Sequence, residues 1–133
     1  MTPDIMVSVA ADVDVLVARQ KARALAATLH FSPSELTLIA TAISEIARNI
    51  LLYAGRGEIV LRIVEQLRRR GIIVIARDQG PGIADTEQAM VDGYSTSGGL
   101  GLGLPGAKRL MDEFEVVSAP DRGTTITMIK WES

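Results

Sequence analysis

Two runs of β-branched residues constrain the fold of this chain more than any other feature. Residues 58–65 and 71–78 are rich in isoleucine and valine, and a short segment with the arginines 68–70 separates them, directly before Gly71. Runs of this composition, joined by a short turn, predict neighbouring antiparallel strands. We interpret the arginines as part of a solvated turn, because no other basic block exists and the net charge is -2. The sequence therefore predicts no nucleic-acid partner.

Helical signals are clearest just before these strands. Ser32 and Glu35 have the spacing of a capping box, and Pro33 occupies the first helical position, where its fixed φ and missing N–H are harmless. The helix that begins here is expected to continue to about Ala54 and to stop at Gly55.

The other predicted elements complete one domain over residues 1–133. They are a strand at 4–9, a helix from Val13 to about Leu29, a short helix at 85–91, a helix at 102–111 with Pro105 and Gly106 in its first turn, and strands at 115–118 and 124–130. The first of these helices has Asp12 as its predicted N-cap, and its apolar stripe is composed of Val13, Leu16, Val17, Ala24, Leu25 and Leu29. This order predicts an α/β (α+β) sandwich with a mixed, largely antiparallel sheet and helices on one face.

Composition narrows the class of protein further. The chain has no cysteine, which excludes disulfides, thiolate metal sites and cysteine nucleophiles. No apolar run approaches the roughly 20 residues that span a bilayer, and the N-terminus lacks a signal-peptide pattern. The single histidine, His30, is interpreted as a helix-end residue. We expect a cytoplasmic protein without a membrane partner.

Glu45 and Asn49 lie one helical turn apart in the Ser34–Ala54 segment and so project from the same face. One interpretation is a solvated face on which Glu45 pairs with Arg48. Asparagine is a mediocre helix residue, however, and its amide oxygen beside a carboxylate suits Mg²⁺. Both interpretations stand on spacing alone.

Asp78 ends the second strand and is followed at once by Gly80 and Gly82. Acids at strand ends often cap turns, and this segment is a turn. A carboxylate with glycine-walled surroundings can also accept a hydrogen bond from an exocyclic amine such as that of adenine.

A glycine-rich segment, residues 98–103, runs directly into a helix and forms a potential anion site. Gly101, Gly103 and Gly106 match the dinucleotide-binding spacing, but no apolar strand precedes them, so we reject that interpretation. The segment is also not a P-loop, because no Ser or Thr follows Lys108. Glycines and hydroxyl residues before a helix are typical of a lid over phosphates.

These three motifs, in this order, resemble the GHKL ATPases, which share the Bergerat ATP-binding fold. The resemblance covers roughly residues 33–130 and is greatest for the RsbT-type serine/threonine kinases of the bacterial stressosome. It implies Glu45 as general base, Asn49 as ligand of Mg²⁺, and Asp78 on the adenine amine with help from Thr124. The implied ATP-binding residues also include Gly80 and Gly82 at the base and, in the lid, Ser97, Gly98, Gly99, Leu100, Gly101 and Gly103.

The resemblance also implies a function. It is that of a protein-serine/threonine kinase in a partner-switching stress module, with STAS-domain proteins as substrates and a PP2C-type phosphatase activated by the released kinase. The alternative is an ATP-gated binding switch, similar to anti-sigma factors, with little catalysis. One departure is that no Lys or Arg lies between Asp78 and Ala107, whereas the broader anti-sigma kinases carry a basic residue in their lid. Charge at the γ-phosphate must then come from Mg²⁺, lid N–H groups, Arg48, Lys108 or a partner.

Overall fold

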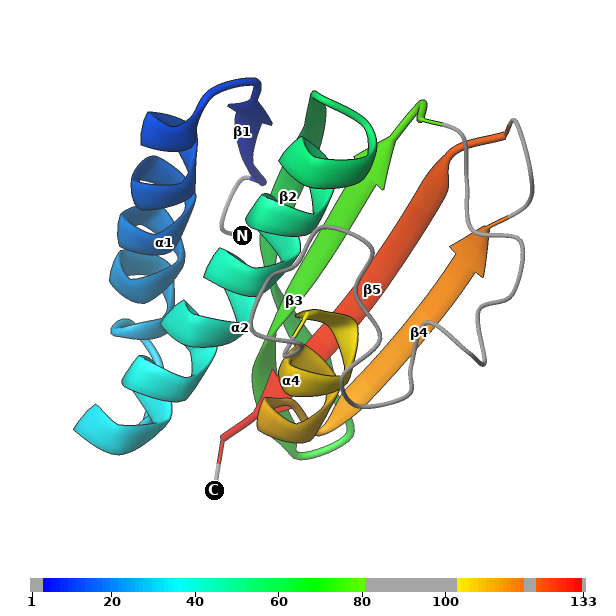
Figure 1. Cartoon of the computed structure of the whole chain (residues 1–133). Helices are drawn as coiled ribbons and strands as arrows, with labels where there is room; N and C mark the ends of the chain where they lie inside the picture. The colour runs from blue at the N-terminus through cyan, green and yellow to red at the C-terminus, as the bar shows by residue number, and fades with distance from the viewer. Residues whose placement is uncertain (1–3, 81–102, 119–121, 133) are drawn as a thin grey trace.

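The computed structural model describes residues 4–80, 103–118 and 122–132, and these form one sheet with helices across one of its faces (Figure 1). The elements are β1 (Ile5–Val9), α1 (Asp12–Ala26), α2 (Pro33–Tyr53), β2 (Gly57–Gln66), β3 (Arg69–Asp78), α4 (Gly103–Leu110), β4 (Glu113–Ser118) and β5 (Thr124–Trp131). The predicted helix at 85–91 lies outside the described residues. The predicted α/β sandwich with helices on one face is confirmed.

The sheet has the strand order β1-β2-β3-β5-β4, and each of its four pairings is antiparallel. The sheet was predicted to be mixed and largely antiparallel. Among the described residues all of its pairings are antiparallel. Alternate residues of each strand face the helices and form the core with them. The core residues from the three central strands are Ile59, Leu61, Ile72, Val74, Ala76, Ile126 and Met128.

The capping box of α2 is present as predicted. The Ser32 hydroxyl accepts the Glu35 N–H at 3.1 Å, and the Glu35 carboxylate accepts the Ser32 N–H at 2.9 Å. The helix ends as expected, since Gly55 follows it with a φ of +80°.

By its length and composition alone, α2 is long and apolar enough to cross a membrane. The sequence had been expected to contain no apolar run of that length. Half of its most apolar stretch is nevertheless buried in the protein. The helix packs on both α1 and α4 and supplies core residues from Ile39 to Ile50. These contacts identify α2 as a core helix.

The predicted apolar stripe of α1 is wrong at the start of the helix, whereas Leu25 and Leu29 are buried as predicted. Asp12 is inside the helix, and Asp14 performs the N-terminal capping by accepting the N–H groups of Ala10 and Ala11 at 2.9 and 3.0 Å. The buried face is composed of Val15, Ala18, Ala22, Leu25 and Ala26. Val13 and Leu16, predicted on the apolar stripe, are 62% and 54% exposed.

The hairpin turn is shifted from its predicted position. The two residues between β2 and β3 are Leu67 and Arg68, whereas Arg69, Arg70 and Gly71 belong to β3. Gly71 pairs with Trp131, and a Cβ atom on it would lie 2.8 Å from the indole ring. This close packing explains a glycine within the strand.

Candidate functional site

One end of the sheet, beside the C-terminal end of α2, brings together two of the residues that the sequence predicted as a site, Asp78 and Thr124. The strand register places Asp78 between Gly57 and Thr124, and Thr124 pairs in turn with Ser118. All four residues lie in the row that continues the core-facing positions of their strands. Segments more than 60 residues apart in sequence therefore supply one wall.

Asn49 is buried, with 8% of its surface exposed, although the sequence predicted it on a polar face. Its carboxamide makes no hydrogen bond with any residue that the structure describes. The other two buried polar residues do have partners, because Ser44 donates to the Ala40 carbonyl at 2.9 Å and Thr124 contacts the Ser118 hydroxyl at 2.8 Å. Buried polar groups are normally satisfied, so Asn49 is available to a ligand.

Glu45 lies one turn before Asn49 and is partly exposed. Its Oε1 atom is 3.3 Å from Nη1 of Arg48, so the i,i+3 ion pair that the sequence offered as an alternative is present. Arg48 is largely exposed, and pairs of this kind contribute only a few tenths of a kcal/mol. The pairing is thus weak enough to open when another group approaches either residue.

Asp78 folds the chain back at the end of β3. Its Oδ1 atom accepts the Gly80 N–H at 2.9 Å, which is an Asx turn, and this contact leaves Oδ2 without a hydrogen bond among the described residues. Gly80 lies against the end of α2, where an added Cβ atom would be 2.6 Å from Cβ of Ala54. Backbone proximity therefore requires glycine here.

Hydrogen bonds of Ser118 hold the loop before β5, and they involve Gly123 and Thr124. Of these residues, Thr124 was predicted as part of the site. Gly123 has a φ of +76°, and Ser118 donates to its carbonyl at 3.0 Å while contacting Thr124. Ser118 was not predicted as part of this region. The alternation of β4, in which Phe114, Val116 and Ser118 share a face, is the signal that could have found it.

Most of the predicted lid falls outside the described residues, namely Ser97, Gly98, Gly99, Leu100 and Gly101, and so does Gly82 of the predicted base pocket. Gly103 is the first residue of α4, in which Pro105 and Gly106 occupy the first turn as predicted. Leu104 and Ala107 are buried, and α4 packs against α2. The helix that follows the predicted lid is thus anchored to the helix that carries Glu45 and Asn49.

The donor set fits a magnesium–nucleotide complex better than a metal held by the protein alone. In the described part of the chain no group of three His, Cys, Asp or Glu side chains could hold a metal ion. Mg²⁺ often binds through one or two protein oxygens, several waters and the substrate phosphates. A carboxamide oxygen without a hydrogen bond among the described residues, such as that of Asn49, is consistent with this mode.

Comparison with known proteins agrees with the geometry. Residues 9–130 match the histidine kinase-like ATPase domain family. The chain is 53% identical to the serine/threonine-protein kinase RsbT of Bacillus subtilis (strain 168), over 89% of each protein. It is 33% identical to the anti-sigma F factor of Caldanaerobacter subterraneus subsp. tengcongensis, over 86% of this chain and 82% of that protein.

A solved structure agrees with the fold. The mycobacterial sensor histidine kinase MprB superposes with a TM-score of 0.58 over 98% of this chain and 97% of that one, at 16% identity. At this identity the likeness concerns the fold alone. The fold, the three motifs and the match over residues 9–130 lead to one conclusion: the chain belongs to the histidine kinase-like ATPase domain family, the GHKL group.

Proposed function

We propose that this chain is a protein-serine/threonine kinase that transfers the γ-phosphate of ATP to a partner protein, with residues 1–133 acting as one domain. The observation that carries the proposal is the 53% identity to the kinase RsbT, which extends over 89% of both proteins. The positions of Glu45 and Asn49 one turn apart on α2, and the pairing of Asp78 with Thr124 at the end of the sheet, support the same chemistry.

In this proposal Asn49 holds the nucleotide-bound magnesium through its amide oxygen. Magnesium, when bound, neutralises charge on the phosphates. The burial of Asn49 and its lack of a described hydrogen-bond partner support this role. Gly99, Gly101 and Gly103, with Ser97, Gly98 and Leu100, are proposed to surround the phosphates.

The adenine base is proposed to bind at the end of the sheet. Asp78 would accept the exocyclic amine through the carboxylate oxygen that does not cap its own turn. Thr124 would assist, because it pairs with Asp78 across β3 and β5. Gly80 and Gly82 would line the pocket, and at Gly80 no side chain fits beside Ala54.

Glu45 is proposed as the general base. Its carboxylate would accept the proton of a serine or threonine hydroxyl while the hydroxyl oxygen bonds to the γ-phosphorus and the bond from phosphorus to ADP breaks. The position of Glu45 one turn from Asn49, partly exposed on α2, supports this role. The ion pair with Arg48 must open or tilt before the carboxylate reaches a substrate hydroxyl.

The partners are proposed from the kinship with RsbT. We propose STAS-domain proteins of a stressosome complex as substrates and a PP2C-type phosphatase as the target of the released kinase, all in the cytoplasm. Since no Lys or Arg occurs between Asp78 and Ala107, charge on the transferred group must be balanced by magnesium, lid N–H groups, Arg48, Lys108 or the partner.

A second candidate function is an ATP-gated binding switch with little catalysis. The 33% identity to an anti-sigma F factor favours it. The two candidates differ in whether phosphate is transferred, since both require bound ATP.

The test is the intact mass of the STAS-domain protein encoded nearest this gene, after incubation with the chain and Mg-ATP. Glu45→Ala serves as the paired variant and Thr41→Ala, on the exposed face of α2, as the control. We expect one added phosphate with wild type and with Thr41→Ala, and none with Glu45→Ala although ATP still binds. Bound ATP without any transfer by wild type would favour the switch.

A further inference from the structure

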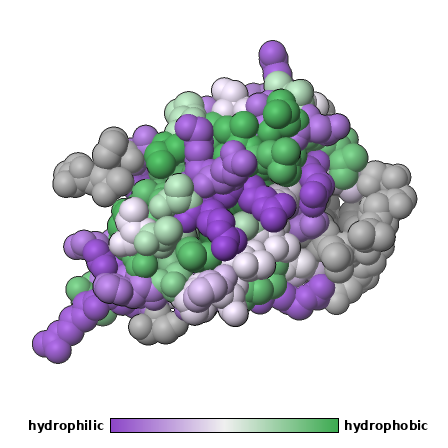
Figure 2. Space-filling model, turned by 90° about the vertical axis from the view of Figure 1, so that its left-hand side faces the viewer, coloured by the Kyte–Doolittle hydropathy of each residue, from purple (hydrophilic) through white to green (hydrophobic). Residues whose placement is uncertain are grey.

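A groove of about 320 Å³ lies between α1 and α2, on the surface next to Glu45. The first turns of α1 and the last turns of α2 line it, with Asp12, Val15, Leu16, Arg48, Leu51 and Leu52. Figure 2 shows this side of the molecule, with hydrophobic side chains gathered in its upper part, where these ends of α1 and α2 lie in Figure 1. The groove is distinct from the wall formed by the sheet at Asp78 and Thr124.

The groove has exposed apolar walls and a polar margin. Leu16 on α1 is 54% exposed, and Leu52 on α2 is 60% exposed. Asp12 and Arg48 supply one acid and one base to the lining. An apolar groove with so few charges is typical of a site that receives a protein segment.

Arg48 belongs to the groove and to the proposed catalytic site at once. It lines the groove, and its Nη1 atom is 3.3 Å from Oε1 of Glu45. Among the described residues this is the only ion pair of Arg48. While the pair is closed, Oε1 of Glu45 is held by the guanidinium and is not free to turn toward a substrate hydroxyl.

We propose that this groove receives the protein substrate and that a carboxylate of the substrate draws Arg48 away from Glu45, which couples docking to release of the base. The inference rests on the kinase activity proposed above. The occupant is a segment near the acceptor Ser or Thr, with an apolar side chain between Leu16 and Leu52 and an Asp or Glu opposite Arg48. Charge complementarity supports this occupant, because Arg48 is the basic residue in the lining and repulsion from Asp12 directs the acid toward it.

The apolar contact is tested with Leu16→Ser and Leu52→Ser. Two control variants are matched to them: Val13→Ser, at a residue as exposed as Leu16 on the same helix, and Leu67→Ser, fully exposed at the hairpin tip. Neither control residue lines the groove. With the STAS-domain protein named above as substrate, we expect KM for that protein to rise on the order of tenfold in the groove variants and to stay unchanged in the controls.

The coupling is tested with Arg48→Ala, because Arg48 is a positioning residue whose loss has opposite effects on two reactions. Hydrolysis of ATP without any partner is expected to rise roughly twofold, since Glu45 is then free to activate water and the lost ion pair is weak. KM for the partner protein is expected to rise on the order of tenfold, because the acidic residue of the partner loses its counter-charge. Arg48→Lys, which keeps the charge, should restore part of the affinity for the partner.

Each outcome bears on the inference separately from the kinase proposal. Phosphate transfer by wild type with equal KM values in groove and control variants would overturn the docking site while leaving the kinase proposal intact. A fall in kcat in Arg48→Ala, with no rise in partner-free hydrolysis, would assign Arg48 to the phosphate and overturn the coupling. No transfer by wild type, with ATP bound, would overturn the kinase proposal and the inference that rests on it.

Discussion

Gly123 lies so close to the carbonyl group of Asp78 that a Cβ atom added to it would overlap the carbonyl oxygen and come within 3.0 Å of the carbonyl carbon. The residue also has a φ of +76°, which side chains rarely adopt. Two segments of the proposed adenine pocket, the end of β3 and the start of β5, therefore meet through backbone alone.

Gly123→Ala should destabilise the protein by about 3 kcal/mol, because the clash adds to the left-handed strain. Gly55→Ala is a matched control, since Gly55 has a φ of +80° but nothing lies within 4 Å of the added atom. Strain alone should cost about 1 kcal/mol there. Urea unfolding of both variants measures the difference in the free energy of unfolding. Equal losses in the two variants would show that the close contact with Asp78 does not contribute to the destabilisation.

Asn49→Ala should weaken binding of ATP in the presence of Mg²⁺ by on the order of tenfold or more, because one oxygen ligand is lost. In excess EDTA the variant and wild type should bind ATP alike, since the amide then has no ion to hold. Calorimetric titration with and without the metal measures both. A loss of equal size under the two conditions would mean that Asn49 contacts the nucleotide itself or supports the fold.

The sequence predicted those parts of the fold that depend on local signals. The capping box at Ser32 and Glu35 was correct, because both hydrogen bonds form within three residues. The face of α1 was only partly correct, because its buried side includes Ala18 and Ala22. Small residues allow close helix approach but hardly register in a hydrophobic pattern.

The candidate site shows the same division. Asp78 was singled out from its place at a strand end and Thr124 from the family resemblance, and the register makes the two residues neighbours. The burial of Asn49 could not be predicted from the sequence, because its position on α2 relative to Glu45 and Arg48 suggested a solvated face. Only the packing of helices around the C-terminal half of α2 determines which polar residues are covered.

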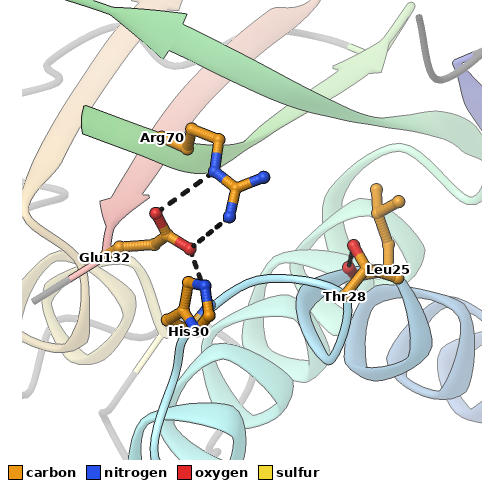
Figure 3. Close-up of polar contacts among 5 residues, drawn as sticks. All are labelled: Leu25, Thr28, His30, Arg70 and Glu132. Atoms are coloured by element: carbon orange, nitrogen blue, oxygen red, sulfur yellow. Dashed lines mark hydrogen bonds and ion pairs between the residues drawn. The ribbon is translucent and has the colours of Figure 1, made fainter. Parts of the chain in front are cut away.

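Glu132 links the C-terminal strand to the loop between α1 and α2 (Figure 3). Its carboxylate accepts the His30 N–H at 2.6 Å and pairs with Arg70 at 3.2 Å. The hydrogen bond from the His30 backbone is the main cause that lowers the pKa of Glu132, and Arg70 adds to it. A lowered pKa in the folded state means that the charged form stabilises the fold.

Glu132→Gln should therefore be less stable than wild type at neutral pH, and the difference should shrink as the pH falls. The sign follows from linkage: stability is fully present above the pKa of an unfolded glutamate, about 4.3, and is lost as the pH falls through the lower folded value. Thermal unfolding from pH 7 to pH 3 measures this. Glu115→Gln, at an exposed position on β4, should show no such convergence, and a difference independent of pH for Glu132→Gln would exclude the charge as its cause.

Leu67 is the fully exposed first residue of the two-residue turn between β2 and β3, and its φ is +57°. A left-handed leucine costs roughly 1–2 kcal/mol, and its side chain buries nothing in return. Glycine is preferred at the first central position of such hairpin turns when that residue alone has a positive φ. Leu67→Gly should therefore raise the free energy of unfolding by about 0.5 kcal/mol, after the greater entropy of the unfolded chain offsets part of the relief.

Arg68→Gly separates the two contributions, because Arg68 lies in the same turn without a positive φ. Here glycine relieves no strain and only enlarges the unfolded ensemble, so the variant should lose about 0.5–1 kcal/mol. Urea unfolding of the two variants should thus give changes of opposite sign at adjacent positions. Destabilisation by both would mean that the backbone of Leu67 is not strained in the folded protein.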